Sequence, residues 1–313
     1  MNRLRRASPP TAGPQRLATF EIPLNGPLAL EPTFESGQAF RWRRGEGGWW
    51  CGLIGERLLH LRQVRPERSR RGRGGLQAQC AAGDEGGAAL AIRRYLRLDD
   101  DLDTVYRRIA VDDHIRRAIA QYRGMRIVRQ DPWECLVSFV CSPASNIPRI
   151  RQVVERVCVR YGESARLGRE TRSAFPTPGR LVGATEADFR SLGCGFRARY
   201  LAALVEMANA GLIELAPLAG LPYQEARRRL EALPGVGPKV ADCVLLFSLE
   251  KLEAYPVDLH IRRETLEIYG GYFTAYAGRA EVPYDAIASW ARDYFGEYAG
   301  YAQQYLFHRR RKG

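Results

Sequence analysis

The sequence predicts an α+β fold in which a small N-terminal antiparallel β-sheet domain precedes a mostly α-helical body. Residues 18–64 carry short alternating or aromatic stretches separated by glycine-containing turns, which is the pattern of β-strands. From Ala89 onward, apolar residues recur at helical spacing. The 313 residues suffice for two domains. We therefore assign residues 17–97 to the β domain and 98–313 to the helical body.

Two segments fit neither pattern. Residues 1–16 are rich in proline and arginine, and we expect a disordered basic arm there. Residues 65–88 (RPERSRRGRGGLQAQCAAGDEGGA) combine charges and glycines with little that can be buried, so we expect a mobile Arg/Gly insertion in the β domain. A solvated insert is the simpler interpretation of this segment than a loop that grazes DNA.

The charge balance indicates a polyanionic partner. Lysine and arginine number 48 against 35 acidic residues, a net charge of +13, which favours nucleic acid over an acidic membrane. No apolar run approaches the roughly 18 residues that a membrane span needs. The seven cysteines include no C-x-x-C pair, so we expect a reducing compartment, no disulfide framework and no metal or redox cofactor.

The segment Leu233–Phe247 (LPGVGPKVADCVLLF) carries the clearest chemical signal. A helix ends at its start, Gly235 and Gly237 permit a tight hairpin, and a proline suits the first turn of the next helix. Backbone amides exposed at such a helix start can bind a DNA phosphate. The predicted helix-hairpin-helix covers about residues 223–248.

Lys239 and Cys243 are four residues apart and therefore share one face of the second helix of the hairpin. One interpretation is a solvated lysine paired with Asp242. However, lysine occurs only at positions 239, 251 and 312 of this arginine-rich chain, and only a lysine amine can be deprotonated and act as a nucleophile. Asp258 follows Lys239 by nineteen residues. Taken by itself, Asp258 would be interpreted as the N-cap of a helix.

The hairpin with Asp258 resembles the helix-hairpin-helix DNA glycosylase superfamily, and within it the 8-oxoguanine DNA glycosylases. Four further segments are similar to that family in the same order: SGQAFRWR (36–43), RQDPWECLVSFVCS (129–142), LGCGFRARY (192–200) and YAGYAQQYLF (298–307). The resemblance covers residues 18–308 apart from the Arg/Gly segment. The superfamily members with a four-cysteine iron–sulfur cluster are excluded as close matches, because no cysteine follows Cys243.

The resemblance implies a bifunctional base-excision repair enzyme. It would flip 8-oxoguanine out of duplex DNA, excise it and cleave the resulting abasic site by Schiff-base β-elimination. Lys239 would be the nucleophile, and Asp258 would stabilise the cationic sugar while also capping its helix. The expected partner is double-stranded DNA containing oxidised guanine, with no membrane, no cofactor and a monomeric state. We expect the cytoplasm, beside the nucleoid, for a bacterial source, and the nucleus or mitochondrion for a eukaryotic one.

The resemblance also implies a base pocket. The carbonyl of Gly37 would accept the extra imidazole-ring proton of 8-oxoguanine, Gln303 would read the Watson–Crick edge, and Cys243 and Phe307 would sandwich the base. Without the resemblance, Cys243 and Phe307 would be interpreted as ordinary core residues.

The remaining site residues implied by the resemblance contact the DNA strands. Phe196 would fill the gap left by the flipped nucleotide. Arg149 and Arg197 would bind the estranged cytosine, and contacts with DNA are expected at Asn146, Gly235, Gly237 and His260. The chain departs from the family where a run of asparagines is usual, because Ala144 stands there. We therefore expect a weaker preference for cytosine opposite the lesion.

Two other functions are compatible with the helix-hairpin-helix motif. One is a monofunctional glycosylase that removes alkylated bases with the aspartate alone, although that chemistry has no need of Lys239. The other is a non-catalytic helix-hairpin-helix protein that holds DNA through its phosphates. A G-x-G-x-x-A match at residues 193–198 follows no apolar strand and is dismissed as a dinucleotide site.

Overall fold

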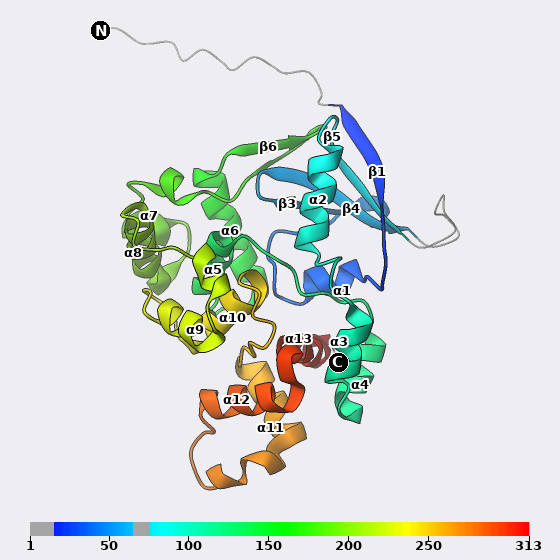
Figure 1. The fold of residues 1–313 in the computed structure, drawn as a ribbon. Coiled ribbons are helices and arrows are strands. Elements are labelled where there is room, and N and C mark those ends of the chain that lie inside the picture. The colour runs from blue at the N-terminus through cyan, green and yellow to red at the C-terminus, as the bar shows by residue number, and fades with distance from the viewer. Residues whose placement is uncertain (1–15, 65–74, 313) are drawn as a thin grey trace.

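The computed structural model describes residues 16–64 and 75–312. It has the expected α+β architecture, with an N-terminal sheet placed on a larger helical body (Figure 1). The sheet is antiparallel, in the order β1-β5-β4-β3-β2. Its strands are β1 (Leu17–Pro23), β2 (Arg43–Arg44), β3 (Trp50–Ile54), β4 (Arg57–Val64) and β5 (Gly75–Ala81).

The prediction of a mobile insertion over 65–88 is wrong for its second half. β5 lies between β1 and β4, and its residues Leu76, Ala78 and Cys80 are at most 1% exposed. The helix α2 (Glu85–Tyr95) starts within the same segment. The alternation of apolar residues with glutamines in LQAQCA is a strand pattern that the surrounding glycines and arginines obscured. Residues 1–15 and 65–74, where we expected the disordered arm and the rest of the insertion, lie outside the described residues.

The N-terminal domain differs from an all-β expectation in one more element. Residues 30–35 form a short helix, α1 (Leu30–Glu35), which places Phe34 in the domain core. The Phe34 ring stacks on Trp42 with centroids 4.2 Å apart, and Trp42 Nε1 donates a hydrogen bond to the Tyr95 hydroxyl at 3.0 Å. Through Trp42, which directly precedes β2, these contacts pack α1 and α2 against the sheet.

The helical body is built from α3 onward. Its helices are α3 (Leu102–Ile109), α4 (Asp113–Gln121), α5 (Pro132–Val140), α6 (Ile147–Tyr161), α7 (Glu186–Ser191), α8 (Ala198–Asn209), α9 (Tyr223–Glu231), α10 (Pro238–Ser248), α11 (Leu259–Tyr269), α12 (Tyr284–Phe295) and α13 (Ala299–Lys312). A two-stranded hairpin, β6 (Ser164–Leu167) and β7 (Glu170–Ser173), is inserted between α6 and α7. In the described residues no helix is both long and apolar enough to cross a membrane.

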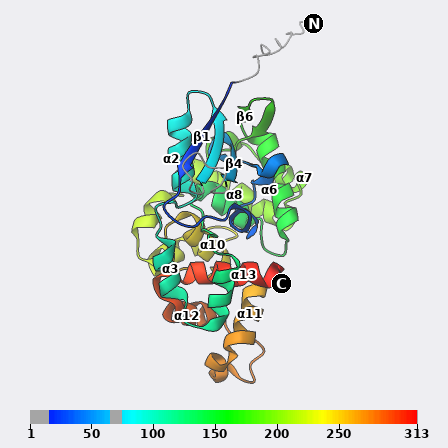
Figure 2. The same cartoon turned by 90° about the vertical axis from the view of Figure 1, so that its right-hand side faces the viewer.

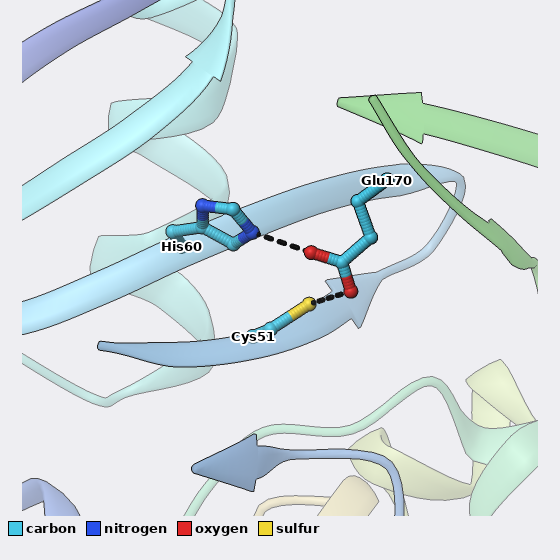
Figure 3. A group of neighbouring side chains, drawn as sticks. All are labelled: Cys51, His60 and Glu170. Atoms are coloured by element: carbon cyan, nitrogen blue, oxygen red, sulfur yellow. Dashed lines mark hydrogen bonds and ion pairs between the residues drawn. The ribbon is translucent and has the colours of Figure 1, made fainter. Parts of the chain in front are cut away.

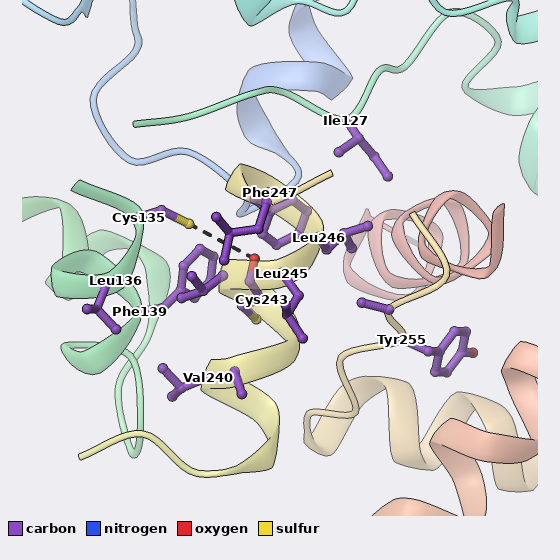
Figure 4. Packing of buried hydrophobic residues seen from close by; sticks show 14 of the residues in the cluster. Ile127, Cys135, Leu136, Phe139, Val240, Cys243, Leu245, Leu246, Phe247 and Tyr255 are labelled. Carbon is purple, nitrogen blue, oxygen red and sulfur yellow. Dashed lines mark hydrogen bonds between the residues drawn. The ribbon is translucent and has the colours of Figure 1, made fainter. Parts of the chain in front are cut away.

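The core of the body forms around α10 (Figure 4). Every residue from Val240 to Ser248 is buried, and Phe247 stacks on Phe139 of α5 with ring centroids 5.5 Å apart. α13 runs across the body in Figure 2 and is buried from Ala299 to Leu306. These two helices carry most of the residues discussed below, so the site is anchored in the best-packed part of the protein.

Gly52 in the sheet packs so closely against another side chain that no larger residue fits there. A Cβ on Gly52 of β3 would overlap the Trp42 ring. We therefore expect Gly52→Ala to lower the free energy of unfolding by about 1–3 kcal/mol, the usual cost of overpacking. Gly86→Ala is the matched control, because nothing lies within 4 Å of that Cβ and alanine favours the surrounding helix. Urea unfolding curves that show equal stability for Gly52→Ala and the wild-type chain would contradict this packing.

Candidate active site

The expected helix-hairpin-helix is formed by α9 and α10. Gly235 at the turn has φ +77°, and a Cβ there would lie 2.7 Å from Tyr200 Cγ. Both the backbone conformation and the close approach to α8 therefore require glycine. Gly237 is exposed and precedes Pro238, the first residue of α10. The hairpin thus presents the backbone at the start of α10 to solvent, as an anion-binding turn must.

Lys239 lies in the first turn of α10 and is half-buried. Its Nζ donates a hydrogen bond to Ser142 Oγ at 3.0 Å and lies 5.0 Å from the centroid of the Phe139 ring. The alternative pairing of Lys239 with Asp242 is wrong. Asp242 is fully buried and accepts hydrogen bonds from the hydroxyls of Tyr223 and Tyr284, each at 2.6 Å.

Cys243 follows Lys239 by one helical turn and is 3% exposed. Burial raises the pKa of the Cys243 thiol to about 12, while the nearby Lys239 ammonium acts in the opposite direction. The charge of Asp258 also raises this pKa. At neutral pH, Cys243 is consequently an uncharged surface against which a flat apolar face can pack.

Asp258 performs the expected capping role. Its Oδ1 accepts a hydrogen bond from the Ile261 backbone N–H at 2.8 Å, at the first turn of α11. The cap occupies one carboxylate oxygen, so the same side chain can direct negative charge at a substrate with the other.

Gln303 and Phe307 lie one turn apart on α13. Gln303 is 4% exposed and its Nε2 donates to the Pro256 carbonyl at 3.1 Å, two residues before Asp258. Gln303 Oε1 is buried and has no hydrogen-bond partner among the described residues. Phe307 meets His260 edge to face, with ring centroids 6.1 Å apart. α13 therefore brings an unsatisfied acceptor and an aromatic face to the segment that carries Asp258.

Gly37 lies against the same aromatic ring. Its φ is +79°, and a Cβ there would lie 3.3 Å from Phe307 Cε1 and 2.6 Å from Ile147 Cδ1. The structure thus brings six of the predicted residues to one region, namely Gly37, Lys239, Cys243, Asp258, Gln303 and Phe307. The link between Gly37 and α13, in particular, joins residues from opposite ends of the chain.

Three residues that our sequence analysis did not single out hold this region together. Ser142 contacts Lys239, as described above. Gln304 Nε2 donates to the Ser36 carbonyl at 2.8 Å, and Gln38 Nε2 donates to the Thr33 and Arg126 carbonyls at 2.9 and 2.8 Å. All three lie in segments that resemble the family, but nothing in the sequence separates them from their neighbours.

Of the residues expected at the DNA strands, His260 contacts Phe307 in this region, whereas Asn146, Arg149, Phe196 and Arg197 lie outside it. Phe196 is 49% exposed, whereas Arg197 beneath it is 5% exposed and donates to the Pro143 carbonyl. Asn146 caps α6 by accepting from the Arg149 N–H at 2.9 Å, and Arg149 itself is exposed. A surface hollow of about 440 Å³ is lined by Asn146, Arg149, Arg156 and Gly193 among others. DNA contacts of these residues stay predictions, and that of Arg197 requires its guanidinium to leave the position seen here.

Comparisons with known proteins agree with this geometry. Residues 21–136 match the family model for the N-terminal domain of 8-oxoguanine DNA glycosylase. The N-glycosylase/DNA lyase OGG1 of Arabidopsis thaliana is 34% identical over 315 aligned positions, covering 97% of this chain and 82% of the plant protein. The Clostridium acetobutylicum 8-oxoguanine glycosylase/lyase, solved with double-stranded DNA containing cytosine opposite 8-oxoG, has a TM-score of 0.82 at 28% identity. That match covers 94% of this chain and 98% of the clostridial one.

A helix-hairpin-helix with Lys239 in its second helix, followed by the capping Asp258, places the chain among the DNA glycosylases of the helix-hairpin-helix class. The relatives narrow this class further. The chain belongs to the 8-oxoguanine DNA glycosylase family.

The contact between Lys239 and Ser142 predicts a positioning role for the serine. We expect Ser142→Ala to slow imine formation with an abasic-site oligonucleotide by up to about 10-fold, since the hydrogen bond that orients the amine contributes roughly 0.5–1.5 kcal/mol. Borohydride trapping measures this rate, and the DNA dissociation constant should stay unchanged. Ser248→Ala is the control, because Ser248 Oγ donates to the Val244 carbonyl as Ser142 Oγ donates to the Phe139 carbonyl, each at 2.7 Å, but Ser248 does not contact the lysine. Equal trapping rates for the two variants would rule out the positioning role.

Proposed function

We propose that this chain excises 8-oxoguanine from duplex DNA and cleaves the abasic site through an imine on Lys239. The observation that carries the proposal is the placement of the Lys239 amine at the start of α10, beside the Cys243 thiol, whose pKa the charge of Asp258 also raises. The relatives named N-glycosylase/DNA lyase support this activity over a monofunctional enzyme or a protein that only binds DNA.

The chemistry follows from these groups. The neutral Lys239 amine attacks C1′ of the flipped nucleotide, the glycosidic bond breaks, and the base leaves with the bonding electrons and takes up a proton. Asp258 stabilises the positive charge that develops on the sugar. The sugar ring opens to an imine, loss of a C2′ proton then drives out the 3′ phosphate, and the strand is cut. Hydrolysis of the imine returns the free lysine.

The unpaired oxygen of Gln303 explains why the pocket accepts a guanine-type base. A buried acceptor without a partner costs roughly 1–3 kcal/mol, which a ligand donor recovers. The Watson–Crick edge of guanine supplies N–H donors, whereas the imidazole-ring N–H of 8-oxoguanine faces the Gly37 carbonyl. An undamaged guanine lacks this second donor and is discriminated against. The enzyme acts as a monomer, in the compartment that holds the DNA.

The proposal predicts the behaviour of a lysine variant. Lys239→Gln should slow 8-oxoguanine release by roughly 1,000-fold or more, because the nucleophile is gone, while leaving affinity for undamaged duplex nearly unchanged. Single-turnover release and a binding titration measure the two quantities. Lys251→Gln is the matched control, since its Nζ only donates to the Ala219 carbonyl at 2.8 Å. If Lys239→Gln retains strand cleavage, another amine forms the imine.

Ala144 predicts a relaxed choice of the opposite base. It has φ +48°, a left-handed conformation that asparagine adopts more readily than alanine, and it stands where the family usually has a residue that reads cytosine. We expect the wild-type chain to prefer cytosine by less than about 100-fold, near the upper range of one good base contact. Ala144→Asn should increase that preference without loss of stability. Excision rates opposite each of the four bases test this, and a wild-type preference of about 100-fold or more would contradict it.

A further inference from the structure

A second group of reactive side chains lies in the N-terminal sheet, outside the site described above. Cys51, His60 and Glu170 place a thiol, an imidazole nitrogen and a carboxylate within 4.8 Å of one another (Figure 3). Cys51 Sγ is 2.8 Å from Glu170 Oε1, and His60 Nε2 is 2.8 Å from Glu170 Oε2. The three donors therefore point at one small volume.

The backbone fixes this convergence. Cys51 in β3 and His60 in β4 are directly opposite in the antiparallel register, so their side chains share one face of the sheet. Glu170 begins β7, in the hairpin inserted into the helical body. A small apolar cluster beside the group joins the same two parts of the chain: Cys51, Leu53 and Leu58 from the sheet, and Ala165, Leu167 and Ala174 from the hairpin segment. The group thus spans the contact between sheet and hairpin.

The hydrogen bonds around His60 leave a lone pair facing a carboxylate. Gln79 Nε2 donates to Thr19 Oγ1 at 3.3 Å, so Gln79 Oε1 faces His60 Nδ1 at 3.0 Å and accepts its proton. In the neutral ring, Nε2 then carries a lone pair directed at Glu170 Oε2. Two acceptors at 2.8 Å need a cation between or beside them. A metal ion meets this need.

The chemical types of the three ligands favour zinc over other metal ions. We propose that Cys51, His60 and Glu170 bind one Zn²⁺, with water as the fourth ligand, and that this ion fastens the β6–β7 hairpin to the sheet. Thiolate, imidazole and carboxylate are the three ligand types that zinc accepts together. The bond from His60 Nδ1 to Gln79 matches the outer partner that metal-bound histidines usually have. Arg172, the nearby cation, is paired with Glu155 at 3.0 Å and also donates to the Cys51 carbonyl at 3.5 Å, so it borders the site without occupying it.

Zinc binds the Cys51 thiolate, so the metal displaces the thiol proton. Glu170 is 39% exposed in its side chain, so it can move outward to admit the ion.

Cobalt binding to the untagged full-length chain tests the site. We expect one Co²⁺ per chain, with a thiolate-to-metal charge-transfer band that Zn²⁺ abolishes on displacing the cobalt. Cys51→Ser should remove the band. Cys80→Ser, which alters another buried cysteine of the same sheet, should keep it. Zinc in hundredfold excess over its dissociation constant should raise the unfolding temperature of the wild-type chain by about 3 °C, and that of Cys51→Ser by much less.

A second variant separates metal binding from folding. The amide of Glu170→Gln can donate to His60 Nε2, so this variant should fold without a cation while its cobalt affinity falls at least about 10-fold. Absence of saturable cobalt binding by the wild-type chain would overturn the proposal. An unchanged charge-transfer band in Cys51→Ser would overturn it as well. In either case the group is a hydrogen-bonded cluster that holds no metal.

Discussion

The site depends on a single buried helix, α13. Three successive side chains of this helix bond to three separate parts of the chain: Gln303 to the Pro256 carbonyl, Gln304 to the Ser36 carbonyl and Tyr305 to the Met125 carbonyl. Gly300 gives α13 its close approach to α10, since a Cβ there would overlap Leu246. α13 therefore fixes the Gly37 loop, the segment leading to Asp258 and the helix carrying Lys239 relative to one another. A shift of this helix would disturb base recognition and chemistry together.

The rotation of α10 is set by polar contacts on its far side. Asp242 is buried between the hydroxyls of Tyr223 and Tyr284, and removing either partner would leave a buried carboxylate poorly satisfied. With Asp242 held there, Lys239 points in another direction, toward Ser142. The residue that fixes the rotation of α10 and the residues of the site thus lie on different faces of the same helix. The fixed geometry brings the amine to its position without a conformational search.

Local patterns in the sequence predicted the parts that depend on local structure. The hairpin, the cap at Asp258 and the α+β order follow from turn residues, capping residues and periodicity, and the structure has all three. β5 was missed because its alternation is only a few residues long and follows a charged, glycine-rich stretch. Ser142 bonds to a residue 97 positions away, and Gln304 bonds to one 268 positions away. No local sequence pattern predicts contacts over such separations. The same holds for Cys51, His60 and Glu170, whose separation hides them from any search for closely spaced ligands.

The central claim is that one particular lysine becomes covalently attached to the sugar. The most direct test is borohydride reduction of the chain on a duplex with 8-oxoguanine opposite cytosine, followed by digestion and mass mapping of the adduct. The account predicts a reduced sugar remnant on the peptide that contains Lys239. A remnant on Lys251, Lys312 or the terminal amine would contradict it. Release of the base with no adduct would contradict it too, and would indicate that water, assisted by Asp258, attacks the sugar.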